Sequence, residues 1–249
     1  MMQALIMAGG RSERMRASLG PAHKALVRIE GVPLIERNLV TLLAAGARDI
    51  TVAVSQNETD ISAYLANRGQ QLAAAAEARL ELLRETEPLG TIGAAGVVEL
   101  RAAALLIINV DNLTSLNLRK FVSQHIESQA VLTVATHFET FQIPFGQVVI
   151  EQGDIVEYRE KPRLPVCISS GTYVLSRFAC ELISRGQRLD IPALFERVRA
   201  SGGRVAAFPH EAAWIDVNDA EAVRRADVLV ATHGAEFNAG TSPSFVSAQ

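Results

Sequence analysis

Short apolar runs alternate with longer segments of helical spacing through the first half of the chain. Apolar residues dominate 4–7, 50–54 and 104–108, and the apolar spacing of 33–45, 57–67 and 91–100 is nearer 3.6 residues than two. Strands that alternate with helices build a parallel sheet covered by helices on both faces. The sequence therefore predicts an α/β fold with a mainly parallel sheet.

The second half of the chain follows a different pattern. Four strand-like segments with short turns succeed one another, which predicts a small β region added to the sheet, and helical spacing then returns. From His233 the residues are small and polar, which indicates a flexible tail over 233–249 after a single domain over 1–232. The strands are expected at 131–136, 146–150, 155–158, 168–175 and 205–208, and the helices at 176–184, 191–200 and 218–230.

Composition excludes several classes of protein. The 249 residues have a formal net charge of −3 and no basic stripe, which argues against a nucleic-acid polymer as partner. No apolar run approaches the roughly 20 residues of a membrane span, and Cys167 and Cys180 stand apart without metal-ligand spacing. We expect a cytoplasmic protein that binds no membrane. Packing or surface roles are expected for the histidines, which are His23, His125, His137, His210 and His233.

The end of the first predicted strand has the composition of a phosphate-binding loop. Ala8-Gly9-Gly10 lets backbone N–H groups approach a phosphate chain closely, and Arg14 and Lys24 can supply positive charge to it. The pattern is neither that of a Walker-type ATPase nor that of a dinucleotide-binding dehydrogenase. A polyphosphate site is the natural interpretation.

At this point the chain resembles a known family. Ala8-Gly9-Gly10, Arg14-Met15, Lys24 and Gly31-x-Pro33-Leu34-Ile35 are similar to the opening of the sugar-phosphate nucleotidyltransferases, and more loosely to that of the molybdenum-cofactor and cytidylyl relatives. The resemblance continues to about Val230. It implies a Rossmann-like, GT-A-like sheet of mixed but mainly parallel strands.

The resemblance also implies nucleotide and metal ligands. The segment from Glu85 through Gly90 and Thr91 is similar to the family's base-reading turn, and its form most resembles that of the guanylyl-transferring members, which favours GTP. Asp111 matches the metal-binding Asp at a strand end, and Asp216 in Trp214-Ile215-Asp216-Val217 matches the second metal ligand. Mg²⁺ is the expected cofactor, since it binds carboxylate oxygens together with substrate phosphates.

Other segments resemble the sugar side of the family's site. Gly146 follows an aromatic residue, Glu160-Lys161-Pro162 matches the pair that binds sugar hydroxyls and the sugar's phosphate, and Gly171 resembles the wall of the sugar pocket. Trp214 belongs to the same expected sugar-binding set. The resemblance thus assigns one set of residues to the nucleotide and another to a sugar 1-phosphate.

Together these features predict a nucleotidyltransferase that makes a nucleotide sugar and releases pyrophosphate, with Arg14, Lys24, Lys161 and Asp111 as catalytic residues. The resemblance to the guanylyl-transferring members implies that the substrates are GTP, as the nucleoside triphosphate, and a hexose or heptose 1-phosphate. Two alternatives stay open: a cofactor- or alcohol-phosphate nucleotidyltransferase, and a catalytically weak nucleotide-sugar sensor. Val110 stands where the family has Gly, which favours the sensor. Many relatives assemble as dimers or tetramers.

Overall fold

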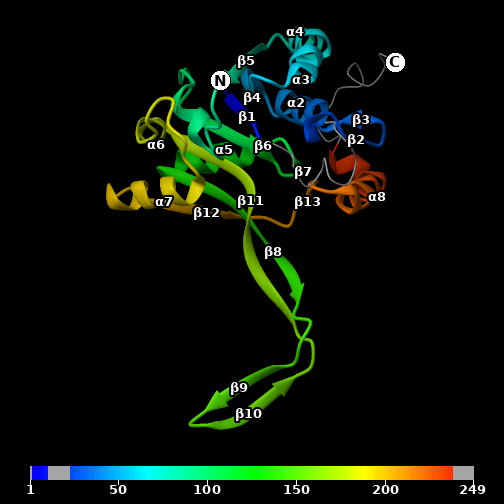
Figure 1. Cartoon of the computed structure of the whole chain (residues 1–249). Coiled ribbons are helices and arrows are strands. Elements are labelled where there is room, and N and C mark those ends of the chain that lie inside the picture. Colours follow the sequence, from blue (N-terminus) through cyan, green and yellow to red (C-terminus); the bar gives the residue numbers. More distant parts are fainter. Residues whose placement is uncertain (1, 11–22, 238–249) are drawn as a thin grey trace.

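A seven-stranded sheet forms the centre of the described chain, in the order β12-β8-β11-β6-β1-β4-β5 (Figure 1). This computed structural model describes residues 2–10 and 23–237. The pairs among β6, β1, β4 and β5 are parallel, as is the pair of β12 with β8, whereas β11 is antiparallel to both its neighbours. The predicted fold class, a mainly parallel sheet flanked by helices, is confirmed.

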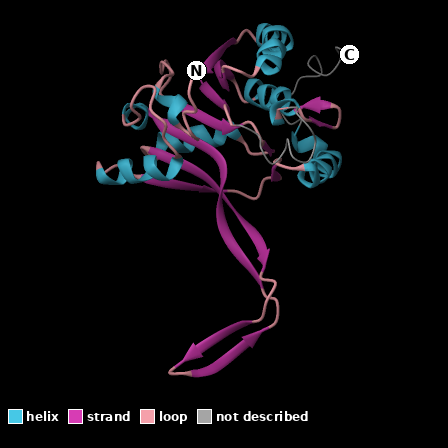
Figure 2. Cartoon of the chain, in the orientation of Figure 1, coloured by secondary structure: helices cyan, strands magenta, loops and turns pink. Residues whose placement is uncertain are grey.

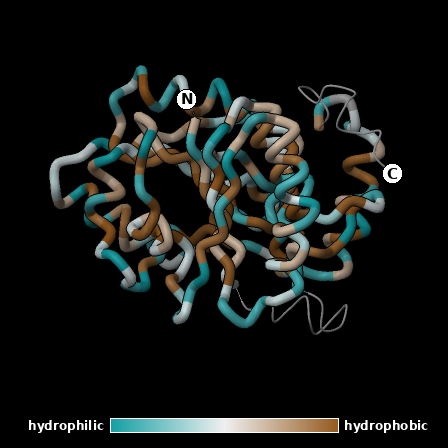
Figure 3. The backbone as a smooth tube through the Cα atoms, turned by 90° about the horizontal axis from the view of Figure 1, so that it is seen from above, coloured by the Kyte–Doolittle hydropathy of each residue, from teal (hydrophilic) through white to brown (hydrophobic). Residues whose placement is uncertain are grey.

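Alternate residues of the central strands enter two separate cores. Ala4, Ile6 and Ala8 of β1 (Met2–Ala8) face a cluster that includes buried residues of α2 (Leu34–Ala44) and α5 (Leu118–Glu127). Leu5 and Met7 face the opposite cluster, which includes residues of α6 (Arg177–Glu181) and α7 (Ile191–Ala200). Helices therefore cover both faces of the sheet, and hydrophobic residues concentrate in its interior (Figures 2 and 3).

The remaining elements complete the two layers around the sheet. A third, smaller core joins α8 (Ala220–Phe237) to β7 (Asn112–Thr114) and β13 (Trp214–Asp216) through Leu113, Ile215 and Val230. The other elements are β2 (Arg28–Ile29), β3 (Val32–Pro33), β4 (Ala47–Ser55), α3 (Thr59–Tyr64), α4 (Gln70–Ala75), β5 (Arg79–Glu85), β6 (Ala104–Asn109), β8 (Leu132–Gln142), β9 (Gln147–Glu151), β10 (Asp154–Arg159), β11 (Arg163–Ser176) and β12 (Val205–Pro209).

A long β ribbon leaves the body where β8 and β11 continue beyond the sheet (Figure 1). Their antiparallel pairing runs without interruption from Ser169 opposite Thr136 to Arg163 opposite Gln142, and the hairpin of β9 and β10 forms the tip. We call residues 138–168 the arm. No residue of the arm belongs to the three hydrophobic cores of the described chain.

Several local predictions were wrong, and tertiary contacts explain them. Residues 91–100 do not form a helix but a short 3-10 turn, Gly93–Gly96, which packs closely on a neighbouring loop. A Cβ on Gly93 would lie 2.6 Å from the Gln187 carbonyl oxygen, and one on Gly96 would lie 2.5 Å from that of Ile183. The edge strand β5, the short strand β7 and helix α5 were not predicted.

The end of the described chain extends past the predicted start of the tail. Helix α8 continues to Phe237, with non-helical backbone angles at His233, and residues 238–249 lie outside the described part. The division into one domain and a tail therefore stays a prediction. None of the described helices is long and apolar enough to cross a membrane.

Candidate active site

A cleft of about 520 Å³ opens at the carboxyl ends of β1, β5 and β6. Open α/β sheets bind ligands at this edge, because loops from neighbouring strands meet there. Most of the residues that the sequence assigned to the nucleotide meet here, although they come from distant segments. The lining consists of Met7, Gly9, Gly10, Lys24, Glu85, Pro88, Gly90, Thr91, Asn109, Asp111, Arg188 and Asp190.

A lysine and an aspartate face each other in the cleft. The Nζ atom of Lys24 donates to Oδ2 of Asp111 across 2.5 Å, and both side chains are largely shielded from solvent. Asp111 lies two residues after the end of β6, and its backbone carbonyl accepts a hydrogen bond from the Val217 N–H at 2.9 Å. The structure thus places a cation and a carboxylate together at the strand-end side of the cleft.

His23 connects Lys24 to the glycine loop. Its Nδ1 atom accepts from the Ala25 N–H at 3.1 Å, so its Nε2 atom carries the proton and donates to the Gly10 carbonyl at 2.9 Å. The side chain is buried. We expected a packing or surface role for His23. Its hydrogen bond to Gly10 also brings the neighbouring residue, Lys24, next to the glycine loop. Its position next to Lys24 in the sequence was the available signal.

Glu85 brings an unpaired acceptor to the cleft. The side chain is buried at the end of β5, and its Oε2 atom accepts from the Leu89 N–H at 3.3 Å. The Oε1 atom has no hydrogen-bond partner among the described residues. Burial raises the pKa of this carboxyl group, and the Leu89 N–H opposes the shift. A buried carboxylate oxygen without a donor is costly, so it indicates a ligand that supplies one.

Glycines allow the backbone to approach this carboxylate. A Cβ on Gly9 would lie 2.4 Å from Glu85 Oε2, so a larger residue there would displace the Glu85 carboxyl group. Gly90 has a φ of 76°, and a Cβ there would lie 2.6 Å from the Leu189 carbonyl oxygen. Gly90 therefore requires glycine, and Gly9 lets the loop lie against Glu85.

Thr91 supports a loop that the sequence analysis did not include. Its N–H donates to Oδ1 of Asp190 at 2.9 Å, and its hydroxyl oxygen accepts from the Ile191 N–H at 3.0 Å. These two bonds hold the loop that brings Arg188 to the cleft. Asp190 directly precedes helix α7, and Pro192 lies in the first turn of that helix. An Asp followed by a Pro is typical of a helix start, so this pattern could have shown that a loop ends at Asp190.

The second predicted metal ligand lies beside the first. In the antiparallel pair of β13 and β7, Asp216 is opposite Asn112, the residue after Asp111. Asp216 Oδ2 accepts from Asn218 Nδ2 at 2.7 Å. The strand pairing therefore brings both carboxyl-bearing residues to one edge of the cleft region although about a hundred residues separate them.

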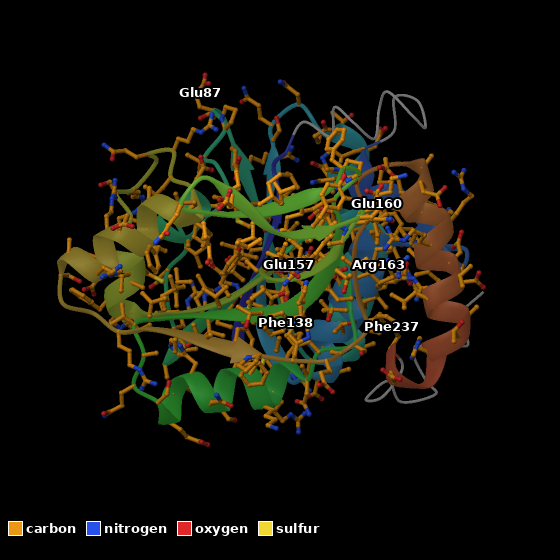
Figure 4. All side chains as sticks on the ribbon, turned by 90° about the horizontal axis from the view of Figure 1, so that it is seen from below. Glu87, Phe138, Glu157, Glu160, Arg163 and Phe237 are labelled. Atoms are coloured by element: carbon orange, nitrogen blue, oxygen red, sulfur yellow. The ribbon has the colours of Figure 1, made fainter. Side chains whose placement is uncertain are left out.

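The predicted sugar-binding residues divide between two places. Gly171 and Trp214 lie at the root of the arm, where the Trp214 indole N–H donates to the Ser170 carbonyl at 2.9 Å and Gly171 has a φ of 66°. Gly146, Glu160 and Lys161 lie on the arm, exposed, and do not line the cleft. Figure 4, a view from below, labels Glu160 with its arm neighbours. The structure does not bring Lys161 to Lys24 and Asp111.

The remaining predicted residues flank the glycine loop. Ala8 is the buried last residue of β1, and its side chain belongs to the core. Arg14 lies outside the described residues. Val110, which stands where the resembling family has Gly, is fully buried in the core and is not part of the cleft lining. Its side chain therefore does not crowd this cleft.

A cluster of histidines at the arm root has no counterpart in the sequence patterns. Ser170 Oγ lies 2.9 Å from His137 Nδ1 and 2.7 Å from His210 Nε2, and the His137 ring stacks on Trp214 with 4.4 Å between centroids. Burial and the neighbouring His137 lower the pKa of His210. Because 73 residues separate the histidines by number, spacing could not reveal that they meet.

A family model described as "Nucleotidyl transferase" matches residues 3–232. The chain belongs to this nucleotidyl transferase family. The matched range includes the glycine loop, Lys24 and Asp111 of the cleft, and their catalytic roles stay a prediction.

Individual relatives are similar at low identity. The D-glycero-alpha-D-manno-heptose 1-phosphate guanylyltransferase of Aneurinibacillus thermoaerophilus is 26% identical over 74% of this chain and 79% of its own length. A mannose-1-phosphate guanylyltransferase of Mycobacterium tuberculosis is 24% identical over 88% of this chain but 61% of its own. The crystal structure of HddC from Yersinia pseudotuberculosis matches with a TM-score of 0.68 and 24% identity over 92% of this chain and 99% of that one, which shows a shared fold.

The acidic residues of this nucleotidyl transferase fit a hard divalent cation. Asp216 lies on β13 opposite Asn112 of β7, and Asp111 directly precedes Asn112, so both offer carboxylate oxygens, the ligand that Mg²⁺ prefers. The described residues contain no group of three or more His, Cys, Asp or Glu side chains that could hold a metal ion. Mg²⁺ commonly completes its coordination with substrate phosphate oxygens and water.

Proposed function

We propose that the chain transfers a nucleoside monophosphate, GMP, from GTP to a hexose or heptose 1-phosphate and releases pyrophosphate. The observation that carries the proposal is the unpaired Oε1 atom of Glu85 in the same cleft as the Lys24–Asp111 pair. Glu85 offers an acceptor to a base, and Lys24 offers charge to a phosphate chain.

The chemistry of Glu85 supports guanine as the base. An ionised carboxylate only accepts hydrogen bonds and can accept two side by side. Guanine presents its N1–H and its exocyclic amino group as adjacent donors, whereas uracil and thymine present a single N–H on that edge. The two relatives by sequence are both named guanylyltransferases. Guanine therefore matches the acceptor better than the other bases do.

The proposed reaction needs no general base. An oxygen of the sugar 1-phosphate attacks the α-phosphorus, the new phosphorus–oxygen bond forms, and the bond to the bridging oxygen of the leaving pyrophosphate breaks. The attacking monoester has a second pKa of about 6, so it is already ionised at neutral pH. Catalysis then depends on position and on neutralisation of charge.

The chain's own residues supply these two effects. Lys24, paired with Asp111, contributes positive charge to the triphosphate, and the Gly9-Gly10 backbone lets the phosphates approach closely. Arg14, outside the described residues, is proposed to assist Lys24 with the leaving pyrophosphate. Asp111 and Asp216 would hold Mg²⁺, which when bound neutralises phosphate charge. Glu160 and Lys161 are proposed to bind the sugar 1-phosphate.

A substrate panel with one matched pair of variants tests the proposal. Pyrophosphate release is measured with Mg²⁺ for each common NTP, paired with hexose and heptose 1-phosphates and with alcohol phosphates. We expect release with GTP and one sugar 1-phosphate, and a loss of about 10²- to 10³-fold in Asp111→Asn, comparable to the removal of one preorganised charge contact. Asp60→Asn, the same change at an exposed position of α3, should leave the rate unchanged.

Other results would identify another function. Release with an alcohol phosphate alone would assign the chain to the cofactor- or alcohol-phosphate nucleotidyltransferases. Tight nucleotide binding without release from any pair would identify a sensor and refute the transferase.

A further inference from the structure

The tip of the arm is amphipathic. In the antiparallel pair of β9 and β10, Val148 is opposite Tyr158 and Ile150 is opposite Ile155, so these four side chains share one face. Ile150, Ile155 and Tyr158 are 63%, 63% and 64% exposed. The opposite face pairs Val149 with Glu157 and Glu151 with Asp154, which suits water. Among the described residues of a single copy, these four apolar side chains stay exposed.

Apolar side chains continue from the tip toward the body. On one face of the arm's ladder Phe141 is opposite Leu164 and Glu139 is opposite Val166, and on the other Phe138 is opposite Cys167. Phe138 is 70% exposed and Phe145, between ladder and tip, is 74% exposed. Soluble single copies rarely expose so many large apolar side chains in one segment, which marks the arm as an interface.

The arm is too weak to stand alone. A two-stranded ribbon is only marginally stable in water unless its apolar face packs against something else. Standard protein interfaces take about 20–30 residues from each partner, and residues 138–168 form a stretch of that size. The arm therefore has the area that a stable contact with a second molecule needs.

The ladder directs the arm away from its own cleft. Pairing between β8 and β11 is continuous from Ser169 opposite Thr136 into the arm, and it joins the pairing of the central sheet through the register shift between Ser169 and Tyr173. At about 3.3 Å per residue the ladder alone extends about 20 Å beyond the sheet before the tip begins. With the ladder paired and the backbone bent at Gly171 as in this structure, Lys161 stays on the arm and does not line its own cleft.

We propose that two copies of this chain exchange arms, so that each arm packs on the partner copy and delivers Glu160 and Lys161 to the partner's cleft. The inference rests on the proposed function, in which these residues bind the sugar 1-phosphate. A two-fold dimer uses the same surface twice, so both clefts are completed at once. The occupant of the apolar face is thus the body of a second copy.

Sedimentation velocity at micromolar concentration tests the interface without reference to turnover. We expect the wild-type chain to be a dimer and Ile150→Asp, on the apolar face of the tip, to be a folded monomer by circular dichroism. Val149→Asp introduces the same charge on the opposite face of the same strand and should remain a dimer. A wild-type monomer, or a dimer unaffected by Ile150→Asp, would overturn the exchange.

Complementation between two inactive variants tests delivery of the site residues. Lys161→Ala loses the arm's cation, and Asp111→Asn loses the cleft's carboxylate. With exchanged arms, a mixed dimer has one intact site, so a one-to-one mixture should recover about a quarter of the wild-type rate. If each arm serves its own cleft, every site carries a defect and the mixture stays inactive, which would refute the delivery.

The wild-type rate in the same assay separates this inference from the proposed function. An active wild type and a silent mixture that contains mixed dimers, verified with two affinity tags, would refute arm exchange alone. A wild type that is silent with every substrate pair would refute the proposed function, and sedimentation of Ile150→Asp would then decide the exchange.

Discussion

At the scale of single residues, Glu85 carries the most specific chemistry, because its buried oxygen lacks a donor. Glu85→Gln replaces this acceptor-only group with one that also donates. We expect kcat/KM for GTP to fall about 10- to 100-fold, the discrimination of one bidentate base contact. Steady-state kinetics with GTP and ATP measure it. A loss equal for both nucleotides would contradict a role in base recognition.

The same carboxyl group makes nucleotide binding depend on pH. Burial raises its pKa, so the folded state binds the proton more tightly than the unfolded chain does. Its contribution to stability is therefore present at low pH and is lost as the pH rises through the raised pKa. The N–H donors of guanine need the ionised Glu85 carboxylate as their acceptor. The Kd for GTP should therefore increase as the pH falls through the raised pKa of Glu85.

Calorimetric titration of GTP at several pH values, with Glu85→Gln as control, checks this dependence. We expect the Kd for GTP to increase at low pH in the wild type and to change less with pH in Glu85→Gln. The nucleotide-free variant should be at least as stable as the wild type at neutral pH, because it removes a buried charge. A Kd with equal pH dependence in both proteins would refute the assignment.

At the scale of elements, the bend at Gly171 joins the arm to the sheet. The register of β11 against β8 shifts between Ser169 and Tyr173, and Gly171 has a φ of 66° there. A Cβ on Gly171 would lie 2.2 Å from Asn112 Nδ2, which donates to the Ser170 carbonyl at 2.6 Å. One backbone position thus connects the arm, β7 and the edge of the cleft.

Gly171→Ala should therefore destabilise the fold by more than backbone strain alone. Strain from a positive φ costs about 1 to 3 kcal/mol. Gly202→Ala is the matched control, because Gly202 has a φ of 74° but open space around its Cβ direction. Urea unfolding of both variants should show the larger loss for Gly171→Ala. Equal losses would mean that Asn112 moves aside without cost.

At the scale of the whole molecule, helix α5 packs against strand β8, and a buried histidine of the helix contacts the strand. His125 Nδ1 lies 2.7 Å from Thr133 Oγ1, and burial lowers the pKa of His125 from 6.5 to about 4. A histidine that is neutral when folded and charged when unfolded loses its contribution to stability as the pH falls from the unfolded pKa toward the folded one.

We therefore expect the free energy of unfolding to decrease between pH 6.5 and about 4. His125→Gln keeps a polar group toward Thr133 but cannot take up a proton in this range. Its unfolding free energy should change less with pH, by on the order of 1 to 3 kcal/mol over the window. Parallel pH profiles for the two proteins, from urea unfolding, would show that another group is responsible.

The sequence by itself determined the fold class and named most of the residues that line the cleft on its glycine-loop side. Periodicity along the chain is local, so alternating strands and helices could be recognised without the structure. Asp111 was expected at the carboxyl end of a strand, where open α/β sheets bind ligands, whereas Gly9 and Lys24 were assigned from loop composition and Glu85 from the family resemblance. The cleft contains all four residues.

Only the tertiary structure decided where the arm points and which distant residues meet. The position of Lys161 depends on the pairing of β8 with β11 and on the bend at Gly171. Neither feature produces a periodic pattern in the sequence. The meeting of His137 with His210, and the entry of Arg188 into the cleft, likewise depend on how strands and loops pack. Packing involves residues far apart in the chain, so local patterns could not determine it.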